Sequence, residues 1–266
     1  MPFTAENRAE YERFGITRIP GALAQTHLDE ISDRVWETLA RRYNIRRDAP
    51  EGWKAHRSAK IIDLPDSLSF DEIAAPSVCE AIDLFLGSGN WQPLKRWSKL
   101  LAAFPESRER WEVPHQSWHL DFRTSRAIAG NFGVRVFTCL ADLEPGGGGT
   151  VVVAGSHRLV EGLMRRTSSI LHSADVRKLL MSTYPWIKAL CSREAKTDRK
   201  QMFMEAGAVL DGTEVRVSEV IGAAGDVVPM HPWLLHAGAT NCANVPRLVL
   251  STTVFRSDLS LSVLFG

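Results

Sequence analysis

The stretch GDVVPMHPWLLHAGATNCANVPRLVLS (residues 225–251) decides the fold class, because it contains short β-branched runs separated by turn residues. Gly, Pro, Asp and Asn bound these runs, which is the pattern of strands in a β-rich domain. Strand patterns of this kind recur from about residue 92 onward: VRVFTCLADLEP (134–145), GTVVVAG (149–155), EVRVSEVIG (214–222), GDVVPMH (225–231) and RLVLSTTVF (247–255). The sequence therefore predicts a β-sandwich or barrel core. Pro229 cannot donate to a strand ladder, so we expect an edge or a bulge at that position.

Helical patterns flank and interrupt this core. Apolar residues recur at spacings of three and four in 24–43, which predicts an amphipathic helix, and a second helix is expected over 71–87. Residues 165–196 read as a mostly helical insert between strands, which we expect to act as a lid. We predict a single domain over 1–266, with a mainly helical part at 1–90 and the core with its insert at 92–256.

Composition excludes several classes of protein. The chain has 266 residues, with 44% hydrophobic and 24% charged residues, as in globular proteins. Its 32 Lys and Arg against 31 Asp and Glu give a net charge of +1, so we expect neither a nucleic-acid nor a membrane partner. Four widely spaced cysteines and a charged N-terminal stretch predict a cytosolic protein without disulfides.

The segment SWHLDF (117–122) places His119 and Asp121 two positions apart. In an extended strand both side chains point to one face, so both can reach one metal ion. An imidazole and a carboxylate are two thirds of the facial triad of non-haem Fe(II) oxygenases. Among the later histidines His236 is the best third ligand, because small residues follow it. His157 reads as a hydrogen-bonding residue in a turn. For His231, which precedes Pro232, a place in the core is an equal alternative to a ligand role.

Several segments together resemble the phytanoyl-CoA dioxygenase family of Fe(II)- and 2-oxoglutarate-dependent oxygenases. They are WHLDF, PGGGGTVVVAGSHR (145–158), the 225–251 stretch and YERFGITRIPGAL (11–23). The resemblance implies a double-stranded β-helix, the jelly-roll fold of cupins, in which His119, Asp121 and His236 hold Fe(II). It also implies that Arg247 binds the distal carboxylate of 2-oxoglutarate, and a guanidinium suits that task because its planar fork of donors matches a carboxylate.

The chain departs from the family pattern near the expected cosubstrate. Phe137 stands where several relatives carry tryptophan, and Gly238 where some carry a serine that helps to hold the carboxylate. The run Gly146–Gly149 lacks the lysine and the helix of a phosphate-binding loop, so we interpret it as a turn. For the other end of 2-oxoglutarate the sequence offers only the weak candidate WSKLLAAF (97–104).

The resemblance implies hydroxylation of a C–H bond in a small organic molecule, with O2 consumed and succinate and CO2 released. Asp121 argues against halogenation, since halogenating relatives lack this carboxylate. Desaturation, ring formation and epimerisation stay open as alternatives, as do a cupin-like non-oxidative metal enzyme and a non-catalytic binder. Arg123, Arg126 and Trp118 are candidate substrate contacts, and Trp111 and Trp233 are candidate lining residues of an apolar pocket.

Overall fold

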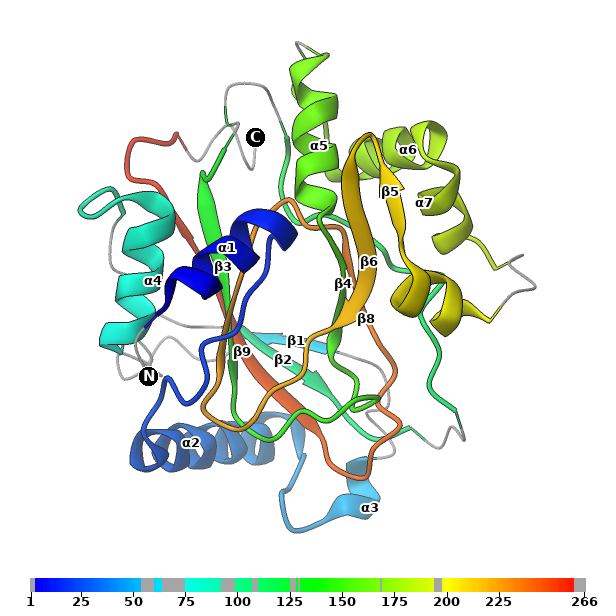
Figure 1. Ribbon diagram of the computed structural model, residues 1–266. Coiled ribbons are helices and arrows are strands. Elements are labelled where there is room, and N and C mark those ends of the chain that lie inside the picture. Colours follow the sequence, from blue (N-terminus) through cyan, green and yellow to red (C-terminus); the bar gives the residue numbers. More distant parts are fainter. Residues whose placement is uncertain are drawn as a thin grey trace.

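The computed structural model describes residues 3–53, 60–63, 75–91, 99–106, 110–124, 128, 130–167, 169–193 and 198–260. Their strands form two antiparallel sheets and no closed barrel (Figure 1). The five-stranded sheet has the order β1 (Lys60–Asp63), β2 (Lys99–Ala103), β9 (Arg247–Phe255), β3 (Gly133–Cys139) and β7 (Val227–Met230). The four-stranded sheet has the order β5 (Ala208–Leu210), β6 (Thr213–Glu219), β4 (Thr150–Ala154) and β8 (His236–Gly238).

From β6 onward the chain alternates between the two sheets, with β7 and β9 in one and β8 in the other. This is the strand order of the predicted jelly roll, which is thus confirmed. Pro229 lies in β7, the last strand of its sheet, as its missing N–H predicts. Residues 16 and 19 make isolated bridges with the outer side of β7, so the N-terminal segment covers this edge.

Helices cover the outer face of the five-stranded sheet. They are α1 (Ala5–Phe14), α2 (Gln25–Tyr43), α3 (Pro50–Trp53) and α4 (Pro76–Leu86). Buried residues of these helices pack with Leu248, Leu250 and Val254 of β9, which alternate along the strand with residues that face the other sheet. Helix α2 confirms the helix predicted over 24–43. Helix α4 confirms the end of the one predicted over 71–87, whose residues 71–74 lie outside the described residues.

A second group of helices covers the outer face of the four-stranded sheet: α5 (Ser156–Arg165), α6 (Ser173–Thr183), α7 (Pro185–Leu190) and the π-helix Gln201–Ala206. Val176, Leu180 and Ile187 of this group are completely buried, and they belong to the same apolar cluster as Val151 and Val153 of β4. The helical insert is therefore a packed layer of the fold. This burial argues against the predicted lid, because opening the insert would expose these side chains to water.

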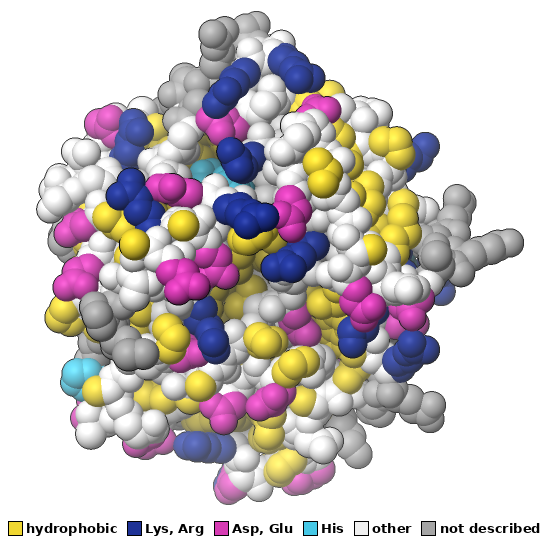
Figure 2. Space-filling view, viewed as in Figure 1, with side chains coloured by type: hydrophobic (Ala, Val, Ile, Leu, Met, Phe, Trp, Pro, Cys, Tyr) yellow, Lys and Arg dark blue, Asp and Glu magenta, His cyan; other side chains and the backbone are white. Residues whose placement is uncertain are grey.

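The interior between the two sheets is a third apolar cluster. It includes Leu101, Phe137 and Val249 from the five-stranded sheet and Val152 from the four-stranded sheet. Charges of both signs are interspersed over the face in Figure 2, as the near-zero net charge leads one to expect. Among the described residues no helix combines the length and the hydropathy that a membrane span requires.

Candidate metal centre

The segment that carries His119 and Asp121 is not the regular strand that the sequence predicted. Instead, residue 119 forms an isolated antiparallel bridge to β8, in which the His119 N–H donates to the His236 carbonyl at 2.9 Å and the His236 N–H donates back at 3.0 Å. Trp118 and Leu120 are buried in the apolar cluster beneath the helices. The alternation thus survives locally, and it leaves His119 and Asp121 on the other side of the segment.

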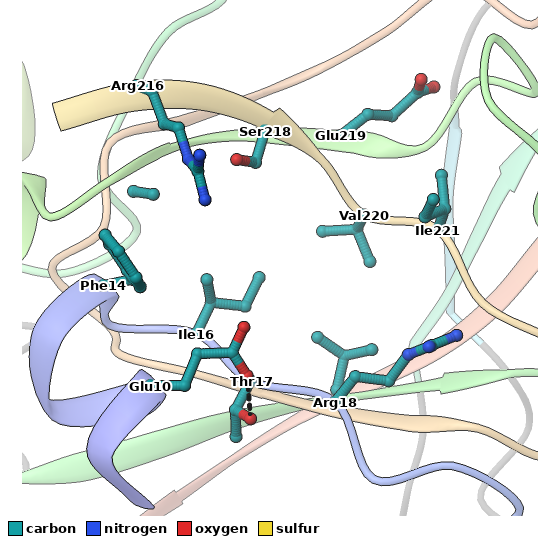
Figure 3. Close-up of a pocket in the computed structure, with 12 residues that line it drawn as sticks. Glu10, Phe14, Ile16, Thr17, Arg18, Arg216, Ser218, Glu219, Val220 and Ile221 are labelled. Carbon is teal, nitrogen blue, oxygen red and sulfur yellow. Dashed lines mark hydrogen bonds between the residues drawn. The ribbon is translucent and has the colours of Figure 1, made fainter. Parts of the chain in front are cut away.

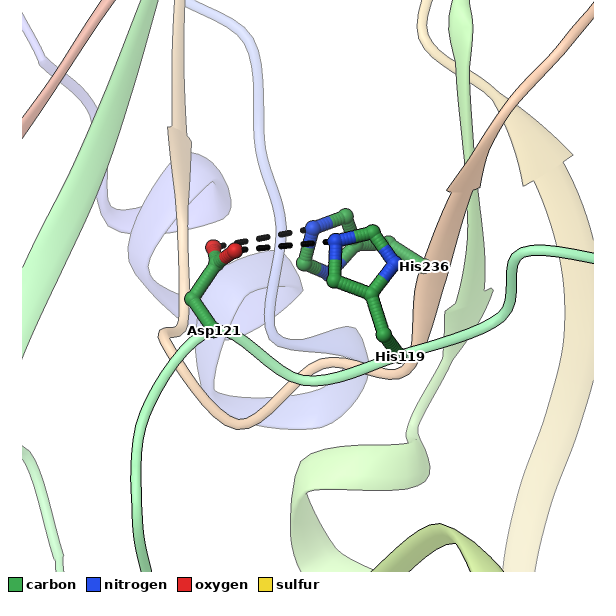
Figure 4. Close-up of side chains that lie close together, drawn as sticks. All are labelled: His119, Asp121 and His236. Carbon is green, nitrogen blue, oxygen red and sulfur yellow. Dashed lines mark ion pairs between the residues drawn. The ribbon is translucent and has the colours of Figure 1, made fainter. Parts of the chain in front are cut away.

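This bridge brings three ligand side chains together (Figure 4). One ligand atom from each of His119, Asp121 and His236 lies within 4.8 Å of the other two. Asp121 Oδ1 is 3.7 Å from His119 Nε2, and its Oδ2 is 3.6 Å from His236 Nε2. The side chains are 49%, 21% and 6% exposed for His119, Asp121 and His236, so the cluster opens to one side.

Hydrogen bonds orient both imidazole rings toward the common centre. His119 Nδ1 donates to the Ser117 carbonyl at 2.7 Å, and His236 Nδ1 donates to the Leu234 carbonyl at 2.9 Å. Each ring therefore offers the lone pair of Nε2. Burial lowers the pKa of His236 well below its ordinary value and lowers that of His119, which keeps both rings neutral and able to bind a metal. The donor set fits a divalent transition-metal ion.

His157 and His231, which the sequence analysis did not choose as metal ligands, lie together outside the cluster of His119, Asp121 and His236. The rings of His157 and His231 have centroids 5.0 Å apart, and His231 Nδ1 accepts a hydrogen bond from the Trp233 N–H. His231 is a buried core histidine, which is one of the two alternatives that the sequence left open. His157 was expected in a turn, but it lies in the first turn of α5, because the helix starts directly after β4 at Ser156. Neither belongs to the metal-ligand cluster found among the described residues.

Arg247, the first residue of β9, is only 5% exposed, and its Nε has no hydrogen-bond partner. Burial lowers its pKa to about 10, so the guanidinium stays cationic at neutral pH. A buried cation without a bonded anion is costly, which favours an anionic ligand at this place. Arg247 shares a face of β9 with Val249, two residues further on, and Val249 and Phe137 belong to the cluster between the sheets. Gly238 lies in β8, two residues after His236, and is exposed.

The sequence did not single out Arg135, which the structure places at the metal ligands. Arg135 lies in β3, is buried, and makes an ion pair through Nη1 with Asp121 Oδ2. Its Nε donates to Ser251 Oγ at 3.1 Å. The sequence contained one indication that Arg135 lies near the site. Residues two apart in a strand share a face, so Arg135 shares the face of Phe137, which was expected near the cosubstrate.

The residues predicted to contact the substrate or to line its pocket lie in several different environments. Trp118 donates its indole N–H to the Pro114 carbonyl at 2.9 Å and packs on the side opposite to His119, which does not favour the predicted substrate contact. Trp233 is likewise a buried core residue. Arg123 is half-buried in the segment that follows Asp121, whereas Arg126 lies outside the described residues.

The glycine run forms the expected turn between β3 and β4. Gly146 and Gly148 have positive φ angles of 80° and 79°, which favour glycine. The N–H groups of Gly146 and Gly149 donate to the Glu219 carboxylate at 2.8 and 3.2 Å. Of the segment 97–104, Leu101 belongs to the cluster between the sheets, and residues 97 and 98 lie outside the described residues.

A surface pocket of about 200 Å³ lies beside the N-terminal segment and β6 (Figure 3). Phe14, Ile16 and Val220 supply its apolar wall, and Arg18 and Arg216 lie at its edges. None of the three clustered metal ligands lines it. The pocket is therefore separate from the candidate metal centre.

The family model described as phytanoyl-CoA dioxygenase (PhyH) matches residues 11–249. No curated protein matches the chain.

Solved structures show the same fold. HygX from Streptomyces hygroscopicus with nickel and 2-oxoglutarate bound is 14% identical, with a TM-score of 0.53 over 98% of this chain and 90% of that one. The epimerase SnoN in complex with Fe3+, alpha ketoglutarate and nogalamycin RO is 15% identical, with a TM-score of 0.50 over 95% and 83%. The non-heme monooxygenase ThoJ is 16% identical, with a TM-score of 0.54 over 95% and 78%.

Proposed function

The chain belongs to the phytanoyl-CoA dioxygenase family, and from this we propose that it is a non-haem Fe(II)- and 2-oxoglutarate-dependent oxygenase. The observation that carries the proposal is the cluster of two histidines and one aspartate, His119, Asp121 and His236, with ligand atoms within 4.8 Å. These three residues would hold the ion, and a set of three protein ligands would leave positions open for cosubstrate, substrate and O2.

When bound, Fe(II) would supply the activation of O2, coupled to conversion of 2-oxoglutarate into succinate and CO2. The chain's own residues bind and orient the reactants. The carbonyls of Ser117 and Leu234 hold the two imidazoles in the tautomer that presents Nε2 to the ion. The buried side of the cluster, where His236 is 6% exposed, keeps water away from the reacting centre.

Arg247 would hold the distal carboxylate of 2-oxoglutarate. Its buried guanidinium has an unpartnered Nε, and a carboxylate would satisfy both the charge and the donor. Phe137, which lies between the sheets, would pack beside the cosubstrate chain. Gly238 offers no side-chain hydroxyl, so Arg247 would bind the carboxylate without help from that position.

We assign hydroxylation of a small organic molecule as the reaction, with Arg123 as a candidate substrate contact. The presence of Asp121 supports this assignment over halogenation, because the carboxylate occupies the position that a halide would need. Epimerisation is the second candidate, because the structurally similar SnoN is an epimerase. We place the enzyme in the cytosol, where its four cysteines would stay reduced; the structure forms no disulfide between them.

The test is an anaerobic titration of the protein with Fe(II) and 2-oxoglutarate, in which a weak visible charge-transfer band reports the chelate. We expect the band in the wild type and in His27→Ala, which removes an exposed histidine of α2. His119→Ala and His236→Ala should abolish it, and Arg247→Met should require much more 2-oxoglutarate. Iron binding without any band in the wild type would contradict the proposal.

The reaction type needs a product analysis. Candidate substrates are screened by succinate release, and the product mass is then measured. A product with one additional oxygen atom supports hydroxylation, whereas a product isomeric with the substrate supports epimerisation.

A further inference from the structure

Arg135 is a buried cation that contacts the metal ligand Asp121. The proposed function gives this arginine no role. Its guanidinium is fixed on two sides, by the Ser251 hydroxyl at Nε and by the Asp121 carboxylate at Nη1. The described residues offer no partner to its third corner, Nη2. The side chain as a whole is 11% exposed, so the guanidinium is not completely enclosed by protein.

The contact with Asp121 places Arg135 beside any other oxygen ligand of the same ion. Two oxygen ligands in neighbouring positions of one metal ion lie about 3 Å apart, because each is roughly 2.1 Å from the metal. A guanidinium that touches one oxygen of Asp121 is therefore within hydrogen-bonding reach of a neighbouring carboxylate. Its planar fork can serve two carboxylates at once.

Arg135 and Arg247 mark two ends of one path along β9. Ser251, which binds Arg135, lies four residues after Arg247, or roughly 13 Å along an extended strand. Residues 247, 249 and 251 share one face of β9, and Val249 of this row belongs to the cluster between the sheets. The two arginines therefore flank one row of side chains that faces the interior.

The charges point to the same ligand. Two arginines and a divalent ion outweigh the single carboxylate of Asp121, so the metal-loaded interior carries excess positive charge. Glu219 is the other acid whose charge acts on Arg247, and its carboxylate already accepts hydrogen bonds from two backbone N–H groups. A dianion therefore complements the pocket better than a monoanion.

We propose that Arg135 binds the 1-carboxylate of 2-oxoglutarate, the end that chelates the metal, while Arg247 binds the opposite end. This inference rests on the proposed function. It supplies the second cosubstrate contact that the sequence could not place, and it assigns that contact to β3 and not to residues 97–104.

The test measures keto-acid affinity by calorimetry on protein saturated with Ni(II), so that turnover is not needed. Two probes are compared: 2-oxoglutarate, and 2-oxobutyrate, which keeps the chelating end and lacks the distal carboxylate. Arg135→Met should weaken both probes by about 10- to 100-fold, the range of a charge-assisted hydrogen bond. Arg135→Lys should recover part of this loss, because it restores the charge without the planar fork.

Arg247→Met is the matched control, since it also removes a buried guanidinium from the same face of the same sheet. It should weaken 2-oxoglutarate and leave 2-oxobutyrate unchanged. Thermal melting and Ni(II) affinity without keto acid are recorded for each variant, to exclude loss of the fold or of the metal.

Three outcomes would overturn the inference. Arg135→Met could bind both probes like the wild type, or it could lose only 2-oxoglutarate, as the control does. It could also lose Ni(II) affinity while its keto-acid affinity at saturating Ni(II) stays unchanged. Arg135 would then only orient the metal ligand Asp121 and would not bind the keto acid. If instead the wild type with bound metal binds no 2-oxoglutarate, the proposed function itself fails.

Discussion

Acid should destabilise the metal-free protein through buried neutral histidines. Burial lowers the pKa of His157 to about 4, and it lowers the pKa values of His231 and His236 well below the ordinary 6.5. The unfolded chain binds a proton at each ring with the ordinary pKa, whereas the folded chain does not. The contribution of these histidines to the free energy of unfolding is therefore fully present above about pH 6.5. It is lost as the pH drops toward their pKa values in the folded protein.

The magnitude can be worked out for His157. Between an unfolded pKa of 6.5 and a folded pKa of about 4, the free energy of unfolding drops by about 2 kcal/mol from pH 7 to pH 5. His231 adds to this loss in the same direction, since its ring is also buried and lies 5.0 Å from that of His157. The whole stability of a domain is only about 5–15 kcal/mol, so acid unfolding should begin near pH 5.

Urea unfolding in the presence of a chelator, at pH 7, 6 and 5, measures this loss. His157→Gln removes one titrating ring and keeps an amide donor, so its loss between pH 7 and pH 5 should be smaller than that of the wild type by about 2 kcal/mol. His27→Gln, at an exposed position, should lose as much as the wild type. The reasoning is refuted if His157→Gln loses stability with acid as steeply as the wild type.

Two further predictions concern stability. Arg199 donates to the carbonyls of residues 190, 114 and 113 at 2.7, 2.9 and 3.0 Å and so ties α7 to the segment before His119. In urea unfolding Arg199→Met should cost about 3 kcal/mol, and the exposed Arg165→Met about 0.5 kcal/mol or less; equal losses would contradict this role. A Cβ at Gly149 would lie 2.3 Å from the Val220 carbonyl, whereas at Gly162 in α5 it meets nothing within 4 Å. Gly149→Ala should therefore lower the melting temperature and Gly162→Ala should not, and a thermal melt in the reverse order would disprove the steric argument.

Local patterns in the sequence predicted much of the architecture. The three- and four-residue spacing in 24–43 corresponds to α2, and the β-branched runs correspond to β3, β4, β6, β7 and β9. The same reasoning did not reach the packing of the insert. Its helices were predicted, but their burial under the four-stranded sheet depends on packing partners far away in the chain, such as Val151 and Val153.

The sequence by itself determined the chemistry of the candidate site, because the residue types are legible without coordinates: imidazoles and a carboxylate for a metal, and an arginine for a carboxylate. Only the tertiary structure decided which side chains meet. The period of a strand tells which residues share a face and not which strand lies opposite. His119 meets His236 through a backbone bridge between distant segments, and Arg135 meets Asp121 only because the two sheets enclose a common interior. These contacts arise when the sheets assemble, so no local pattern encodes them.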